Sequence, residues 1–345
     1  MNFKSTVFAA AIGTALVAGA TQAQTVIKTQ TAMAAGQFTL VYLNENWAPK
    51  VEQMTGGKVK LEILPSQAVV PHREVINAVS AGILQGDFNA VAYYAGKDPA
   101  FGMMGDLIAG YDNVEQFQMF CRFGGGREVL QKIYDKITGG KIHVVGCGPF
   151  SKEGLISSKP LRGVDDLKGI KIRSPEGMAA AVFKAVGASP TAIPWPETYT
   201  AVEKGIVDAA DGSSYTNNSS LGFHKIAKYP LFPGIHSMAV IEFTVNKAVW
   251  DKLGPQGQAA LETWYYAAWT DMSRASDIED RKQAALDRSG KGDPGVEVID
   301  WSQTERDKFR AAAAKVWADY AKQSPLAQEA YDKHIEFMKT YGLLN

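Results

Sequence analysis

The feature that most constrains how this chain folds is a stretch of about 32 residues, 258–289, without proline or glycine. Leu261, Tyr265 and Ala268 lie at spacings of four and three within it, the pattern of one apolar helix face. A helix of this length would extend about 48 Å at 1.5 Å per residue, more than the ~30 Å diameter of a small domain. The sequence therefore predicts a helix that bridges two lobes.

The residues before this stretch alternate between strand and helix patterns. Residues 59–64 alternate apolar and polar side chains with period two, and the helical pattern of residues 35–54 precedes a Gly-Gly stop. Further strands are expected at 87–94, 169–173 and 237–246. Such alternation is typical of mainly parallel sheets, so an α/β fold is predicted.

The N-terminus has the pattern of a secretory signal peptide. Lys4 supplies a positive charge, residues 7–20 are apolar or small, and Thr21-Gln22-Ala23 fits cleavage after Ala23. The apolar run is shorter than the ~20 residues that a membrane span needs. We therefore predict that residues 1–23 are a signal peptide and that the mature chain is exported.

Charge and cysteine content narrow the partners. Lys+Arg and Asp+Glu are both 36, so the chain has no overall field to hold nucleic acid or an anionic membrane. A charged partner must be recognised by a few placed residues. Cys121 and Cys147 are the two cysteines, and an oxidising compartment permits a disulfide between them. Two buried free thiols are the equal alternative.

Catalytic signatures are missing from the sequence. It contains no HExxH, GxSxG, Walker or CxxC motif, and its five histidines have no metal-ligand spacing. We nominate no catalytic residue, no metal ligand and no cofactor. The sequence therefore favours binding over catalysis.

Arg173 is the most informative single residue. It ends the predicted strand 169–173 and precedes Ser174 and Pro175, which are typical of a helix start. Ligands of α/β sheets bind outside the carboxyl ends of strands, and a guanidinium beside a helix N-terminus favours an anion. From position alone, Arg173 is either a carboxylate anchor or a surface arginine paired with an acid.

The sequence around Arg173 resembles a known family. Residues 161–190, with the pattern D-L-K-G-x-K-I-R followed by G-A-x-P, look like the solute-binding subunits of tripartite ATP-independent periplasmic (TRAP) transporters, of the C4-dicarboxylate-binding type. Residues 54–59 and 205–208 agree in kind and order. Residues 221–227 and 233–236 resemble the branch that carries 2-oxo acids and other monocarboxylates. The resemblance covers essentially the whole mature chain.

This resemblance implies a periplasmic binding protein-like fold, with two α/β lobes and a ligand cleft between them. We assign residues 24–150 and 238–275 to lobe I, and residues 151–237 and 276–345 to lobe II. The implied function is a periplasmic receptor that captures a small organic acid and delivers it to the membrane subunits of a TRAP permease. The alternatives are a periplasmic hydrolase or lyase acting on a carboxylic acid, and a binding protein that feeds a sensor. The C-terminal helices pack on their own lobe or join a homodimer.

The resemblance also implies site residues. The family's arginine at the position of Arg173 pairs with the substrate carboxylate, and a second polar contact falls on Lys152, with Glu153 as its neighbour. Asp211 and Gly212 stand where relatives carry a glutamate and a large residue facing the ligand.

Two departures from the family pattern affect the expected ligand. After P-G-x-H, Ser237 stands where this branch often has a carboxylate that helps to hold a metal. Together with Asp211 and Gly212, this departure argues against a metal-bridged 2-oxo acid, and whether a metal bridges the ligand stays open. The absence of a large side chain at Gly212 predicts a wider pocket that accepts a bulkier acid.

Further lining residues are nominated, each with a structural alternative such as core packing, a rigid turn or a solvated loop. Of the pair Tyr93 and Tyr94, one is expected to face the cleft, and Tyr94 is nominated. The other candidates are Phe150, Trp195, Tyr215, Asn217 and His236.

Overall fold

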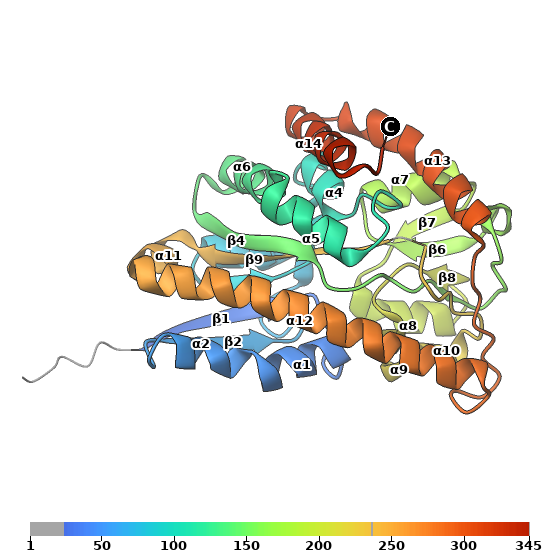
Figure 1. Cartoon of the computed structure of the whole chain (residues 1–345), viewed down its shortest axis with the longest axis horizontal. Coiled ribbons are helices and arrows are strands. Elements are labelled where there is room, and N and C mark those ends of the chain that lie inside the picture. The colour runs from blue at the N-terminus through green and yellow to red at the C-terminus, as the bar shows by residue number, and fades with distance from the viewer. Residues whose placement is uncertain (1–23, 236, 345) are drawn as a thin grey trace, which may run out of the picture.

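The computed structural model describes residues 24–235 and 237–344, which form two β-sheets flanked by helices (Figure 1). The first sheet has the order β2-β1-β3-β9-β4. Its strands are β1 (Thr25–Thr31), β2 (Val59–Leu64), β3 (Gly86–Phe88), β4 (Ile142–Pro149) and β9 (Val240–Asn246). β1 runs parallel to β2 and β3, whereas β9 runs antiparallel to β3 and β4.

The second sheet has the order β5-β8-β6-β7. Its strands are β5 (Ile156–Ser157), β8 (Ala209–Ala210), β6 (Lys171–Ser174) and β7 (Ser189–Ala192). β6 is parallel to both of its neighbours, so the carboxyl end of β6 lies beside those of β7 and β8. The predicted α/β fold class, with two α/β lobes, is confirmed.

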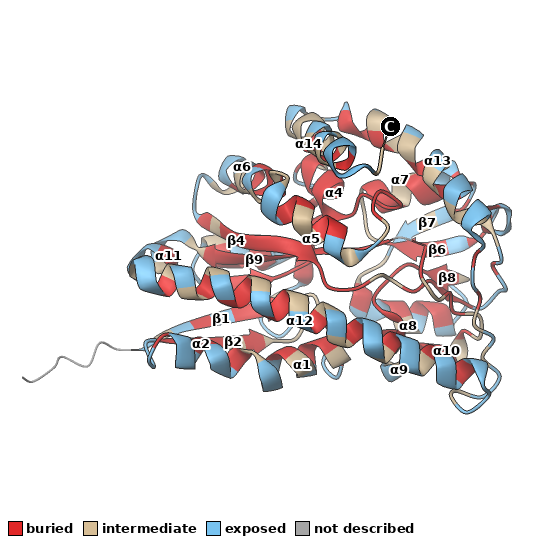
Figure 2. Cartoon of the chain, viewed as in Figure 1, coloured by how far each residue is buried: buried red, intermediate tan, exposed pale blue. Residues whose placement is uncertain are grey.

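Helices cover both sheets, and several of them have one buried and one exposed face (Figure 2). Their bounds are α1 (Phe38–Asn46), α2 (Ala48–Met54), η1 (His72–Glu74), α3 (Val75–Ser80), η2 (Val91–Tyr94), α4 (Pro99–Gly105), α5 (Val114–Phe123), α6 (Gly126–Thr138), η3 (Val164–Leu167), α7 (Met178–Ala185), α8 (Trp195–Glu203), α9 (Tyr215–Ser220), α10 (Phe223–Ile226), α11 (Lys247–Lys252), α12 (Gly254–Arg288), α13 (Gln303–Ala321) and α14 (Pro325–Tyr341). None of the helices in the described residues combines the length and apolarity that crossing a membrane would require.

The predicted long helix is α12, which has 35 residues and runs past both sheets (Figure 1). Leu261, Tyr265 and Ala268 are buried on one face, as their spacing predicts. The helix begins four residues earlier than expected because Pro255 occupies its first turn, where the missing N–H costs nothing. α12 contacts α1 and α2 beside the first sheet and α9 near the second.

The two C-terminal helices pack within the chain. α13 lies against α7, and α14 lies against α4 and α6, with the hydroxyl of Tyr111 2.9 Å from Nδ1 of His334. The proposed lobe boundary placed residues 276–345 in lobe II, whereas α4 and α6 belong to the segment assigned to lobe I. The lobe division therefore remains a proposal, and homodimer formation remains a prediction.

The structure decides two local predictions, one about the strand at residues 87–94 and one about the two cysteines. The strand expected over residues 87–94 ends at Phe88, and Val91–Tyr94 forms the short 3₁₀ helix η2 instead. The chain leaves the sheet at Asn89, whose amide donates to the carbonyl of His72 at 2.8 Å. Cys121 and Cys147 are free, buried thiols rather than a disulfide.

Candidate functional site

Arg173 lies at the carboxyl end of β6 and is only 3% exposed. Its Nε donates to the carbonyl of Ile193 at 2.9 Å, and its Nη1 donates to the carbonyl of Asp211 at 2.6 Å. The guanidinium also lies over the indole of Trp195, with 5.4 Å between the guanidinium carbon and the ring centroid. Main-chain carbonyls thus fix the arginine without neutralising its charge.

A cavity of about 50 Å³ opens beside this guanidinium. Its walls come from the strand ends of both sheets, which places it between the two halves of the fold. The lining residues are Ala32, Met33, Gln37, Ala90, Tyr93, Phe150, Glu153, Arg173, Trp195, Gly212, Ser213, Ala239 and Ile241. A positive charge at the wall of a small, mostly apolar cavity is the arrangement that binds a small carboxylate.

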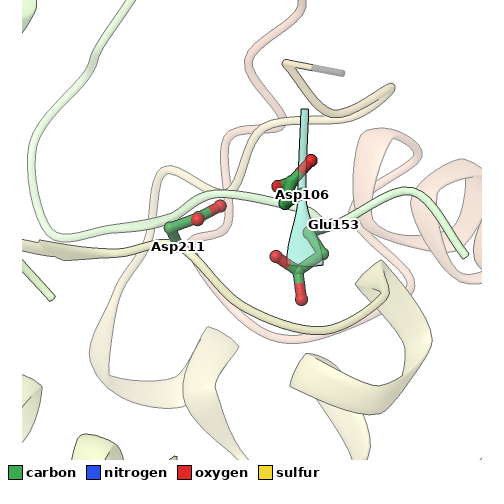
Figure 3. Close-up of side chains that lie close together, drawn as sticks. All are labelled: Asp106, Glu153 and Asp211. Atoms are coloured by element: carbon green, nitrogen blue, oxygen red, sulfur yellow. The ribbon is translucent and has the colours of Figure 1, made fainter. Parts of the chain in front are cut away.

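Three carboxylates gather next to this cavity (Figure 3). Asp106, Glu153 and Asp211 each offer one oxygen, and these oxygens all lie within 4.8 Å of one another. We call these three residues the cavity acid cluster. The Oγ of Ser237 lies 2.7 Å from Oδ2 of Asp106, 3.1 Å from Oε2 of Glu153 and 3.3 Å from Oδ2 of Asp211. A hydroxyl has one proton to donate, so it satisfies only one of these three acceptors.

Burial shifts the protonation of the cavity acid cluster. Burial, and then the charge of Glu153, raises the pKa of Asp106 to about 8. Burial raises the pKa of Glu153, and burial together with the charges of Glu153 and Asp106 raises that of Asp211. Oδ1 of Asp106 and Oδ1 of Asp211 are buried without a hydrogen-bond partner. The cluster therefore needs either bound protons or a cation.

The donor set fits a hard cation such as Na⁺ or Ca²⁺, which prefers carboxylate and hydroxyl oxygens. The cavity acid cluster with the Ser237 hydroxyl supplies such oxygens from four separate segments of the chain. The sequence predicts no metal ligand, and Asp106 is not among the predicted site residues. Asp106 follows α4 in a segment without a recognisable motif, so no sequence signal points to it.

The structure brings several predicted residues together. Arg173, Phe150, Glu153, Trp195 and Gly212 all line the cavity. Asp211 stands behind it: its main-chain carbonyl holds Arg173, and its side chain joins the cavity acid cluster.

Tyr94 needs a correction. Its side chain is 1% exposed in the core, where its hydroxyl is hydrogen-bonded to Nδ2 of Asn89 at 2.7 Å and to Oδ2 of Asp87 at 3.2 Å. Tyr93 lines the cavity instead. The reason is the 3₁₀ turn of η2, which rotates successive side chains by about 120° rather than alternating them.

Three other predicted residues lie outside the cavity. Lys152 faces a different and larger cavity. Tyr215 is buried, with its hydroxyl donating to Oδ2 of Asp287 at 2.7 Å. Asn217 donates to Oγ1 of Thr39 at 3.3 Å and so connects α9 to α1. His236 lies outside the described residues.

The expectation of a widened pocket is also corrected. A Cβ at Gly212 would lie 2.4 Å from Cζ3 of Trp195, so the indole already fills the space that a side chain at position 212 would take. Trp195 is held there by stacking on Phe223, with 5.4 Å between ring centroids. The cavity is therefore small, and the missing side chain at Gly212 leaves no additional room.

Comparisons with known proteins agree with this fold. The chain is 25% identical over 296 residues to a monocarboxylate 2-oxoacid-binding periplasmic protein of Nostoc sp., covering 86% of this chain and 79% of that protein. A TRAP periplasmic solute-binding protein from Rhodobacter sphaeroides, solved in an apo open form, is 34% identical with a TM-score of 0.74 and covers 92% of this chain and 99% of that one. Another from Pseudoalteromonas atlantica, solved with sodium and pyruvate, is 24% identical with a TM-score of 0.78 and covers 93% and 95%.

The fold and the buried cavity between its sheets thus define a solute-binding protein. The sequence model of the bacterial extracellular solute-binding proteins, family 7, matches residues 31–323. The chain belongs to this family, which is made of extracytoplasmic solute-binding receptors rather than enzymes.

Proposed function

We propose that this chain is a periplasmic receptor that binds a small carboxylate and delivers it to the membrane subunits of a TRAP permease. The observation that carries the proposal is Arg173, buried at the cavity wall and held by two main-chain carbonyls. A fixed guanidinium can take a carboxylate without first reorganising. In this proposal residues 1–23 are the export signal, cleaved after Ala23.

The cavity favours a ligand of few heavy atoms. Its volume is about 50 Å³, while one water needs roughly 10–15 Å³ measured in the same way. A short monocarboxylate fits this space better than an aromatic or branched acid. The pyruvate bound by the Pseudoalteromonas atlantica relative supports this size class.

The cavity acid cluster favours a cation that accompanies the carboxylate. Asp106, Glu153 and Asp211, with the Ser237 hydroxyl, would hold it. When bound, the cation would supply positive charge that offsets the three carboxylates beside an anionic ligand. The sodium in the Pseudoalteromonas atlantica relative supports this extension of the proposal.

Contacts between the two halves of the fold support a mechanism of capture by closure. Nε2 of Gln37 donates to Oγ of Ser213 at 3.0 Å, and Arg73 pairs with Glu176 at 2.5 Å. Each contact joins a residue near the first sheet to one near the second. We propose that these contacts break when the receptor opens, so that ligand binding shifts an open–closed equilibrium.

Binding and turnover distinguish this proposal from a hydrolase or lyase. Calorimetry with short acids such as pyruvate, in the presence of calcium or sodium, should show one ligand per chain. The acid should raise the Tm in a concentration-dependent way, and scattering should show a smaller radius of gyration at saturation. Steady conversion of the acid would support the enzyme alternative instead. A complete absence of binding across a panel of carboxylates would overturn the proposal.

A further inference from the structure

Lys152 faces a second cavity, distinct from the one beside Arg173. This cavity, which we call the hinge groove, has a volume of about 500 Å³. Its walls are the start of α5, the segment after β4, the loop before β9 and the middle of α12. The lining residues are Asn113, Val114, Glu115, Gln118, Ser151, Lys152, Gly154, Phe232, Pro233, Gly234, Thr270, Ser273, Arg274, Asp277, Ile278, Asp280 and Arg281.

The hinge groove and the ligand cavity share a wall. Glu153 lines the ligand cavity, whereas its neighbour Lys152 lines the hinge groove. The groove therefore lies on the far side of the segment that carries Glu153.

Lys152 brings a cation into this groove without an acid to pair with it. Within residues 24–235 and 237–344, no carboxylate oxygen lies within 4.0 Å of its ammonium group. Such a lysine gains from an anion that can approach it from the groove.

The acidic residues that line the hinge groove do not form an ion pair with Lys152. Asp277 accepts from Nε of Arg281 at 2.9 Å, and Asp280 accepts from the main-chain N–H of Thr216 at 2.7 Å. Glu115 is exposed at the rim of the groove. The positive side chain of Arg274 is a further cation of the lining.

The remainder of the wall is partly apolar. Val114, Phe232, Pro233 and Ile278 all contribute to it. A volume of about 500 Å³ lies within the usual range for small-molecule sites, ~300–1,000 Å³. We propose that the hinge groove is a second ligand site, which takes an organic anion with an apolar body and pairs its acidic group with Lys152. The proposal does not rest on the role of Arg173.

The test uses 8-anilinonaphthalene-1-sulfonate as the probe, since it joins a sulfonate to an aromatic body. The mature chain should bind one probe molecule with increased fluorescence. Lys152→Met should weaken binding roughly tenfold or more, because the charge-assisted contact is lost. Ser273→Trp should block binding by filling the groove from α12. Lys159→Met is the matched control, since Lys159 is an exposed lysine paired with Asp208.

Three results would overturn the proposal. One is the absence of saturable probe binding by the mature chain. Another is equal affinity in the parent and in both groove variants. The third is loss of probe binding in Arg173→Ala, which would place the probe in the ligand cavity. If Lys152→Met fails to fold, as judged by circular dichroism, Ser273→Trp decides between the outcomes.

Discussion

Two groups of buried carboxylates in this molecule have different surroundings. In the core beside the first sheet, Asp87 accepts hydrogen bonds from the hydroxyls of Thr244 and Tyr94, and Glu242 accepts one from Tyr134 at 2.8 Å. We call Asp87 and Glu242 the core acid pair. Burial raises the pKa of Asp87 to about 7. Each carboxylate of the pair thus has a hydroxyl donor of its own.

The carboxylates of the cavity acid cluster do not each have a separate hydroxyl donor. Among the described residues, its three carboxylates share the single hydroxyl of Ser237. Main-chain N–H groups add one hydrogen bond to Glu153, from Ser213 at 2.9 Å, and one to Asp106, from Met238 at 3.2 Å. The cluster also lies beside a cavity that holds Arg173, whereas the core acid pair is enclosed by aromatic side chains. The two groups therefore differ in their surroundings: the core acid pair receives hydroxyl donors inside the core, whereas the cavity acid cluster borders the cavity of Arg173, where we propose that it takes a cation.

The largest expected effect is on cation binding. Asp211→Asn should weaken calcium affinity by roughly 100-fold, because affinity follows the number of carboxylate ligands. Asp87→Asn, in the core acid pair, should leave calcium affinity unchanged. Calorimetric titration of calcium into the ligand-free protein, with and without pyruvate, measures both. Equal calcium affinity in Asp211→Asn and the parent would show that the cavity acid cluster, like the core acid pair, does not bind calcium.

The second effect is on stability. Tyr134→Phe removes the hydroxyl that donates to Glu242 and should lower the free energy of unfolding by about 1–3 kcal/mol. Calcium affinity should not change. Urea denaturation gives the free energy, and Tyr341→Phe on the exposed end of α14 is the control. A loss of calcium affinity in Tyr134→Phe would show that the two groups are coupled.

The third effect concerns the size of the cavity beside the cluster. Gly212→Trp should drive its side chain into Trp195 and lower the free energy of unfolding by about 1–3 kcal/mol, as overpacking does. Affinity should fall alike for every acid of a panel graded by size, measured by calorimetry. Loss confined to the large acids would reveal open space at position 212 and contradict the packing of Trp195 described here.

The smallest effect is on the pH dependence of stability. A carboxyl whose pKa is raised on folding holds a proton that the unfolded chain releases, so its contribution to stability is lost as pH rises from about 4 to about 8. Asp106→Asn should therefore gain Tm relative to the parent as pH rises across this range, without calcium. The exposed Asp319→Asn serves as the control. A constant difference in Tm between Asp106→Asn and the parent would contradict the raised pKa.

Much of the fold could be predicted because it follows local patterns. The period-two alternation of residues 59–64 became β2, and the apolar stripe of residues 258–289 became most of α12. The strand end made Arg173 a candidate, but only the family resemblance favoured the role of carboxylate anchor over that of a surface arginine. The helix start predicted at Ser174 and Pro175 was wrong, because α7 begins at Met178 after Gly177.

The rest of the site could not be predicted, because it forms where segments far apart in the sequence come together in the fold. Asp106 joins Glu153 and Asp211 only through the tertiary fold. Trp195 fills the space at Gly212 across a turn and a helix, which no spacing reveals. Tyr93 lines the cavity in place of the predicted Tyr94, because a 3₁₀ helix forms where the sequence predicts a strand.

The central claim is that Arg173 anchors the carboxylate of the ligand, and calorimetry on Arg173→Ala tests it most directly. Loss of one partner of a buried ion pair costs about 3–5 kcal/mol, so affinity for the bound acid should fall by roughly two to three orders of magnitude or more. Arg173→Lys should also bind weakly, because an ammonium cannot make the two-pronged contact. Arg162→Ala, at an exposed arginine paired with Glu297, should bind as the parent does. A loss of less than about tenfold in a folded Arg173→Ala protein would contradict the account.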